Sequence, residues 1–164
     1  MSFLKGFVTA LVLLVIAAIA VVYSGVFNVA ATWPDNSVVE WVLHTTMKRS
    51  VQSRAGSATR PPATDEQIRA GAHVYNETCV YCHGGPGKDP VDIGKGLNPE
   101  PPFLADTVGD WTTAQLLWIV RNGVRMTGMP SFAGSHKDED IVNVVAFIQR
   151  LPKMTPEQYD KLTQ

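Results

Sequence analysis

Two cysteines and a histidine stand close together in the run Cys79-Val80-Tyr81-Cys82-His83. About one helical turn separates the two sulfurs, so both thiols can bond to neighbouring vinyl groups of a single haem while the imidazole reaches its iron. The pattern therefore predicts one covalently attached haem c, with Cys79 and Cys82 as the thioether links and His83 as an axial ligand of the iron.

The same cysteine spacing also occurs in thiol-disulfide sites and in halves of zinc sites. A zinc site would need more Cys or His ligands with a short spacing of their own, and the chain has two cysteines in all. A thioredoxin-like site would need a βαβ pattern around the motif, which the sequence does not show. Haem attachment is therefore the favoured interpretation, with a haem-free thiol-disulfide protein as an alternative.

A second iron ligand is expected from a loop far along the chain, where Met129 is followed by Pro130. A thioether opposite an imidazole suits low-spin haem iron and raises its reduction potential relative to two histidines. Met129 is our candidate, although methionine is more often core filler. Met126 is the nearest rival, and His136 or His73 would instead give a bis-histidine site. An open sixth position would allow ligand binding or peroxide chemistry.

Helices are expected on both sides of these residues. Capping boxes that begin at Thr64 and Thr112 predict one helix leading into Cys79 and another ending at Gly123. A third helix follows from about residue 138, and a short terminal helix after Thr155 is expected to fray. Between the first two helices lies a long proline-containing loop, which is expected to wrap a cofactor. The fold class predicted is all-α.

The N-terminal residues 1–23 predict a membrane anchor. From Gly6 to Tyr23 there are 18 residues without a charge, which as a helix would span ~27 Å, close to the thickness of the apolar part of a bilayer. A cleaved secretory signal is the alternative, since Ala18-Ile19-Ala20 resembles a cleavage site. We favour retention because the apolar run continues beyond that site. Lys5 then stays in the cytoplasm, and the haem domain lies in the periplasm, held by a single span of a bacterial inner membrane.

Residues 24–63 are interpreted as a connector that contains an amphipathic helix at about 37–52. A capping box of Ser37 with Glu40 is expected to start it. Five apolar residues fall at a helical period on one face: Val39, Val42, Leu43, Met47 and Val51. This face is expected to lie on the membrane surface, on a partner subunit or on the chain's own haem domain.

From Thr64 to Leu151 the chain resembles a class I c-type cytochrome: a helix leading into C-x-x-C-H, a proline-rich loop, a middle helix, a Gly-Met-Pro loop and a C-terminal helix. The resemblance implies a haem domain at 64–152, followed by a tail at 153–164. It also implies that the first and last helices cross at Gly71 and Tyr75 against Phe147.

The resemblance further implies that a proline carbonyl accepts a hydrogen bond from the iron-ligating histidine, and either Pro101 or Pro102 fits. These prolines and Trp118 are the candidates for the haem pocket. The membrane anchor is similar to that of membrane-bound bacterial monohaem cytochromes and of cytochrome subunits of respiratory complexes.

The predicted function is one-electron transfer. With His83 and Met129 both bound, the iron has no free position for a small-molecule substrate, so the chain is expected to be a carrier and not an enzyme. Its expected partners are the lipid bilayer and membrane-bound redox proteins, as a respiratory shuttle or as the cytochrome subunit of an oxidoreductase complex, with no nucleic acid. A haem enzyme or ligand sensor with an open sixth position is the alternative.

Overall fold

The structure is a computed structural model that describes residues 2–33, 36–57 and 61–163. The chain divides into two compact units, Met1–Pro34 and Asp35–Gln164. The first unit contains helix α1, Ser2–Ser24. Its segment Phe3–Ser24 has a mean hydropathy of 2.7 and is long and apolar enough to cross a membrane.

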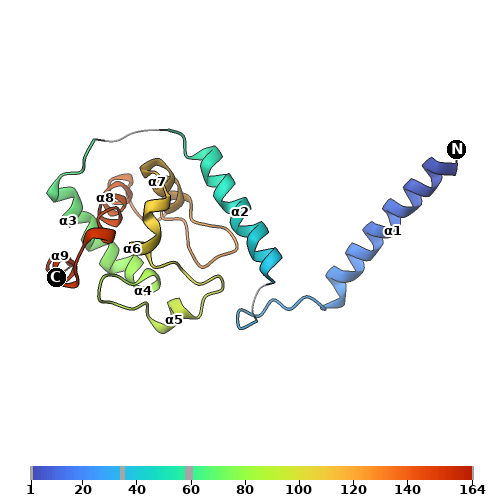
Figure 1. The fold of residues 1–164 in the computed structure, drawn as a ribbon, viewed down its shortest axis with the longest axis horizontal. Coiled ribbons are helices and arrows are strands. Elements are labelled where there is room, and N and C mark those ends of the chain that lie inside the picture. Colours follow the sequence, from blue (N-terminus) through green and yellow to red (C-terminus); the bar gives the residue numbers. More distant parts are fainter. Residues whose placement is uncertain (1, 34–35, 58–60, 164) are drawn as a thin grey trace. The chain divides into compact units, whose positions relative to one another are not determined.

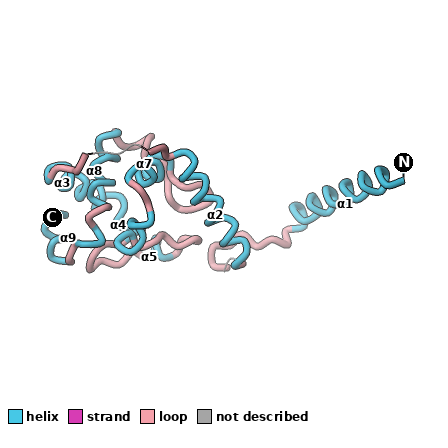
Figure 2. The backbone as a smooth tube through the Cα atoms, turned by 45° about the horizontal axis from the view of Figure 1, so that its top comes forward, coloured by secondary structure: helices cyan, strands magenta, loops and turns pink. Residues whose placement is uncertain are grey.

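The second unit is built from helices and loops, and the described residues contain no β-strand (Figures 1 and 2). This confirms the predicted all-α class. Its elements in chain order are α2 (Ser37–Arg54), α3 (Asp65–Val74), the π-helical turn η1 (Tyr75–Cys79), α4 (Val80–His83), α5 (Asp92–Lys95), α6 (Leu104–Thr107), η2 (Val108–Asp110), α7 (Thr113–Asn122), α8 (Asp138–Ile148), η3 (Leu151–Lys153) and α9 (Pro156–Thr163).

The core of the second unit forms where α3 packs against α8. A methyl group on Gly71 would overlap the backbone carbonyl of Asn143, so glycine is what permits this close approach. One turn later the rings of Tyr75 and Phe147 lie with their centroids 5.3 Å apart, and both side chains are fully buried. The glycine-and-aromatic crossing implied by the family resemblance is therefore present.

Helix N-termini follow their sequence signals in two of three cases. The side chains of Thr64 and Thr112 accept hydrogen bonds from the backbone of the glutamine three residues later, which reciprocates, as predicted. In α2 the predicted cap is wrong: Asn36 is the N-cap and accepts a hydrogen bond from the backbone of Val38, while Ser37 lies inside the helix. An asparagine one position earlier competes well for this role.

Helix α2 does not bury the single apolar stripe that its sequence predicts. Its second half packs beside α7, and Val51 is buried there. Val39, Val42 and Leu43, predicted on the same apolar face, are 37%, 45% and 43% exposed. The chain's own unit therefore covers only the later part of this helix.

The C-terminal helix α9 packs against α3, and the expectation that it frays is wrong. Tyr159 is fully buried, with ring centroids 6.1 Å from Phe147 and 6.3 Å from Tyr75. Lys88 and Asp160 form an ion pair at 3.2 Å, which joins α9 to the turn after the haem motif. Tyr159 is a single aromatic residue among the polar side chains of its own short helix, so the local sequence does not predict its burial.

Candidate functional site

The cysteine motif is delivered by three consecutive helical segments. Helix α3 passes into the π-helical turn η1, which ends at Cys79, and α4 then carries Cys82 and His83. In the π-turn the Thr78 hydroxyl donates a 2.6 Å hydrogen bond to the Val74 carbonyl and lies 3.3 Å from the Cys79 sulfur. This turn sets the direction of the first thiol. Sequence reasoning missed it, because a π-turn has no short sequence signature.

The Cys79 thiol lies in partly apolar surroundings. Burial raises its pKa, and the hydrogen bond to Thr78 opposes that shift. At neutral pH the free thiol therefore keeps its proton, which disfavours a reactive thiol-disulfide site, since that chemistry needs a lowered thiol pKa.

His83 is held in one tautomer. Its Nδ1 lies 2.8 Å from the backbone carbonyl oxygen of Pro102. Because a carbonyl only accepts hydrogen bonds, Nδ1 carries the proton and Nε2 keeps a free lone pair. Burial also lowers the pKa of the ring, which favours the neutral form that a metal requires. Of the two prolines predicted for this hydrogen bond, Pro102 makes it and Pro101 does not.

The proline-rich loop packs closely against the cysteine motif. The backbone amide of Val91 donates a hydrogen bond to the carbonyl of Tyr81 at 2.9 Å. Three residues later a Cβ on Gly94 would come within 2.9 Å of the Cys82 Cα. The loop therefore runs directly against the segment that carries the second thiol. Gly94 is a site residue that sequence reasoning did not single out.

Met129 lies in a loop that closes on itself. The backbone amide of Val124 donates to the Met129 carbonyl at 3.2 Å, and the Met129 amide donates to the Thr127 hydroxyl at 3.1 Å. At the base of the loop Gly123 has a φ of 66° and packs against the backbone of Pro130, where a Cβ would lie 2.5 Å from the Pro130 carbonyl carbon. Met129 is half-buried and packs against the core.

The Met129 loop also touches the proline-rich loop. A Cβ on Gly128 would lie 2.6 Å from a methyl carbon of Leu97, so the two segments are in direct contact there. The loop that provides the Pro102 carbonyl for His83 and the loop that carries Met129 are thus held together.

The rival ligands lie in different surroundings. Met126 is 75% exposed and has a φ of 63°, at the outer turn of its loop. His73 is exposed and pairs with Glu77 at 3.3 Å. Both face solvent and are poor candidates for a buried ligand.

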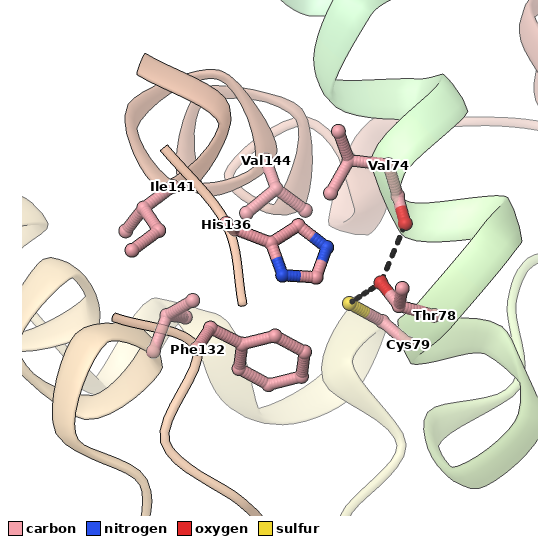
Figure 3. A pocket seen from close by; sticks show the side chains of 8 residues that line it. Val74, Thr78, Cys79, Phe132, His136, Ile141 and Val144 are labelled. Carbon is pink, nitrogen blue, oxygen red and sulfur yellow. Dashed lines mark hydrogen bonds between the residues drawn. The ribbon is translucent and has the colours of Figure 1, made fainter. Parts of the chain in front are cut away.

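His136 lines a small cavity together with Thr78, Cys79 and Phe132 (Figure 3). Its ring packs edge-on to that of Phe132, with centroids 5.2 Å apart, and its Nδ1 lies 2.9 Å from the Ser135 hydroxyl. His136 is thus a neighbour of the first attachment thiol, a position that sequence reasoning did not foresee.

Trp118 is half-buried on α7, and its backbone carbonyl accepts a hydrogen bond from the Asn122 side chain at 2.8 Å. This contact lies within its own helix and has no bearing on a haem pocket. The role proposed for Trp118 stays a prediction.

The donor set fits a haem attached through two thioethers. Cys79 and Cys82 lie one turn apart, a neutral imidazole has Nε2 free, and a second loop carries the half-buried thioether of Met129. Among the described residues no group of three or more His, Cys, Asp or Glu side chains is arranged to hold a metal ion by itself.

Residues 66–148, about half of the chain, match the family described as cytochrome C oxidase, cbb3-type, subunit III. The chain is 27% identical over 139 residues to the quinohemoprotein alcohol dehydrogenase of Comamonas testosteroni, which covers 80% of this chain and 19% of that protein. It is 29% identical to the cytochrome c-type cyt cy of Rhodobacter capsulatus, over 57% of this chain and 53% of that one. It is 31% identical to cytochrome c6 of Thermosynechococcus vestitus, over 54% of this chain and 73% of that one.

Proposed function

The chain belongs to the cytochrome c family described as cytochrome C oxidase, cbb3-type, subunit III. From that premise we propose that it is a membrane-anchored electron carrier whose haem domain faces the periplasm. Its prosthetic group is covalently bound haem c, and its function is electron transfer, as in its cytochrome relatives. When bound, this group supplies a reversible one-electron change at its iron.

His83 and Met129 are the proposed axial ligands, and Cys79 and Cys82 the proposed thioether links. The Pro102 carbonyl holds the Nδ1 proton of His83, which orients the ring and makes Nε2 a better donor. On the second loop, hydrogen bonds with Val124 and Thr127 hold the backbone of Met129. If His83 and Met129 both held the haem iron, they would exclude substrate from it and leave electron transfer as the reaction.

The observation that carries this proposal is the closed loop around Met129 and its contact with the proline-rich loop through Leu97 and Gly128. A thioether held half-buried by its own backbone hydrogen bonds is preorganised to ligate, and the exposed side chain of Met126 is not. Residues 64–152 are the proposed haem domain, and Pro101 and Trp118 are proposed to border its pocket.

Helix α1 supports the proposed anchor by its length and composition. With Lys5 before the span, the positive-inside rule favours a cytoplasmic amino terminus and a periplasmic haem domain at a bacterial inner membrane. Tethering confines the carrier to the neighbourhood of membrane proteins and so raises its effective concentration for them.

Membrane-bound redox proteins are the proposed donor and acceptor, in a respiratory chain or within an oxidoreductase complex. Two relatives are named as alcohol dehydrogenases, the quinohemoprotein enzyme and a 1-butanol dehydrogenase (cytochrome c) of Thauera butanivorans, which is 36% identical over 51% of this chain and 11% of that protein. A haem domain of this type is thus found joined to a dehydrogenase, which favours partners of that class.

The experiment compares Met129→Ala with Met126→Ala in the full chain, coexpressed with haem-maturation factors and purified in detergent. The unaltered chain and the Met126 variant should show low-spin spectra, a weak sulfur-to-iron band when oxidised, and no carbon monoxide binding when reduced. Met129→Ala should keep covalent haem but lose that band, bind carbon monoxide and show a lower potential.

Carbon monoxide binding by the unaltered reduced chain at neutral pH would refute the proposed coordination and favour an enzyme or sensor with an open sixth position. Loss of the sulfur-to-iron band in the Met126 variant alone would show that the wrong methionine had been assigned.

A further inference from the structure

The exposed large apolar side chains of this protein are concentrated before residue 44. Among the described residues, all but four of them lie between Phe3 and Leu43, and the exceptions, Tyr81, Val91, Ile93 and Met126, are spread over the rest of the chain. Single exposed apolar residues are ordinary on a protein surface. A concentration of them in one part of a chain marks a surface that something apolar covers.

The series extends past the predicted anchor and into α2. Between the two helices Val26, Phe27, Val29 and Trp33 are 73%, 68%, 86% and 62% exposed. In α2 the exposed apolar residues are Val38, Val39, Trp41, Val42 and Leu43. At about 100° per residue these five occupy more than half of the helix circumference, and Glu40 and His44 form the remaining polar strip.

Along its axis α2 changes from apolar to cationic. Its second half contains three exposed cations, Lys48, Arg49 and Arg54. Among the described residues no carboxylate forms an ion pair with any of them. Arg49 and Arg54 make hydrogen bonds only to side chains and a carbonyl of their own helix. One open strip of the surface of this helix runs from Trp41 and Val42 at its apolar end to the two arginines.

We propose that the first half of α2, residues 37–43, inserts into the interface of an anionic bilayer, with Lys48, Arg49 and Arg54 at the phosphate level. Basic residues beside an apolar segment with a tryptophan are the features of a helix bound at a membrane interface. This inference rests on the proposed membrane anchor, because α1 brings the helix to the bilayer.

Two features favour lipid over a protein partner. A protein groove contacts one narrow stripe of a helix, whereas the exposed apolar residues here spread over more than half of the circumference and leave one polar strip, as in a helix that lies in a membrane interface. Exposed apolar residues also recur from α1 through Val26, Phe27, Val29 and Trp33 to the start of α2, so one medium can cover all of them. Residues 25–36 between the helices reach at most ~40 Å, which keeps the start of α2 near the membrane.

The consequence is a second attachment point for the haem unit. Val51 is buried in the unit itself beside α7, so insertion of the first half of α2 would restrict how the whole unit turns relative to the bilayer. A carrier held in this way presents one side to membrane partners and does not sample all orientations on a loose tether.

The test uses the full haem-loaded chain in nanodiscs of phosphatidylcholine and phosphatidylglycerol. Both native cysteines are consumed by haem attachment, so one added cysteine is the sole free thiol. Val42→Cys and Gln52→Cys are matched exposed sites in the two halves of α2 and are labelled with a nitroxide. The visible spectrum of each variant checks that its fold is intact.

The label at residue 42 should be relaxed by oxygen and protected from a water-soluble nickel chelate, and the label at residue 52 should be open to the chelate. Equal chelate access at both sites would overturn the proposal. Protection at residue 42 in native membranes but not in nanodiscs would also overturn it, in favour of a protein partner. Vesicle flotation of the same variants tests the anchor α1 separately. If the chain floats with the vesicles but the nickel chelate reaches the label at residue 42, insertion of α2 is refuted and the proposed anchor is retained.

Discussion

The crossing of α3 and α8 can be tested by adding one methyl group, in the variant Gly71→Ala. In a helix exposed to solvent this change gains about 1 kcal/mol, because alanine restricts the unfolded chain and favours helix. Here the new Cβ would lie 2.5 Å from the Asn143 carbonyl carbon and 3.0 Å from the Phe147 Cβ. The nearest of these atoms belong to backbone, which cannot turn aside as a flexible side chain can, so the helices must separate.

Overpacking of this kind costs about 1–3 kcal/mol, and a collision with backbone falls at the upper end of that range. Separation would also loosen the fully buried pair of Tyr75 and Phe147. With the propensity gain subtracted, we expect a net loss of about 2 kcal/mol in the free energy of unfolding.

The assay is guanidinium unfolding of the haem-loaded chain in detergent, followed by tryptophan fluorescence and by haem absorbance. Ala70→Gly is the matched control, since Ala70 is the exposed neighbour in the same helix, and this change should cost about 1 kcal/mol from propensity alone. If Gly71→Ala instead stabilises the chain by about 1 kcal/mol, the close crossing of the two helices is wrong.

Four further predictions concern the surroundings of the haem motif, and all use the same unfolding assay. Tyr159→Ala should cost about 3–5 kcal/mol, whereas Tyr159→Phe should change stability by less than about 1 kcal/mol, because the buried hydroxyl has no hydrogen-bond partner among the described residues. Burial raises the pKa of Tyr159 from 10.0 to about 12, so the unfolded chain releases this proton first. The stability that the protonated hydroxyl contributes is therefore lost as the pH rises from 10.0 to about 12, and Tyr159→Phe should reduce the fall in stability over that range. Lys88→Met should cost less than about 1 kcal/mol, because its ion pair with Asp160 is 42% and 49% exposed at the two side chains; a larger loss would mean that the pair holds α9 in place. Thr78→Val should cost about 1 kcal/mol by removing the hydrogen bond to the Val74 carbonyl, and an unchanged midpoint would show that the π-turn does not depend on that bond.

Several features depend on residues close together in the chain, and the sequence alone was enough to predict them. The spacing of Cys79, Cys82 and His83 predicts haem attachment, and the family match agrees with it. The capping boxes at Thr64 and Thr112 predict the starts of α3 and α7. These signals are readable because a helical turn or a haem-attachment motif is complete within about five residues, and no distant segment is needed to define it.

The features that required the tertiary structure depend on where distant segments meet. Pro101 and Pro102 are adjacent and chemically alike, and only the path of the loop decides that the Pro102 carbonyl faces the His83 ring. Tyr159 lies in a short polar helix whose composition predicts fraying, yet it fills the space beside Tyr75. Its burial comes from aromatic contacts with Phe147 and with Tyr75, and Tyr75 lies more than 80 residues away in the chain.

Helix α2 shows both kinds of information in one element. Its sequence determined that a helix forms between about residues 37 and 52, since a run of residues with helical periodicity needs no partner to be recognised. It did not determine which part of that helix is covered, because burial depends on what packs beside it. The tertiary structure decided that Val51 is buried beside α7 while Val42 is left exposed, and this division of one helix is what points to the membrane interface.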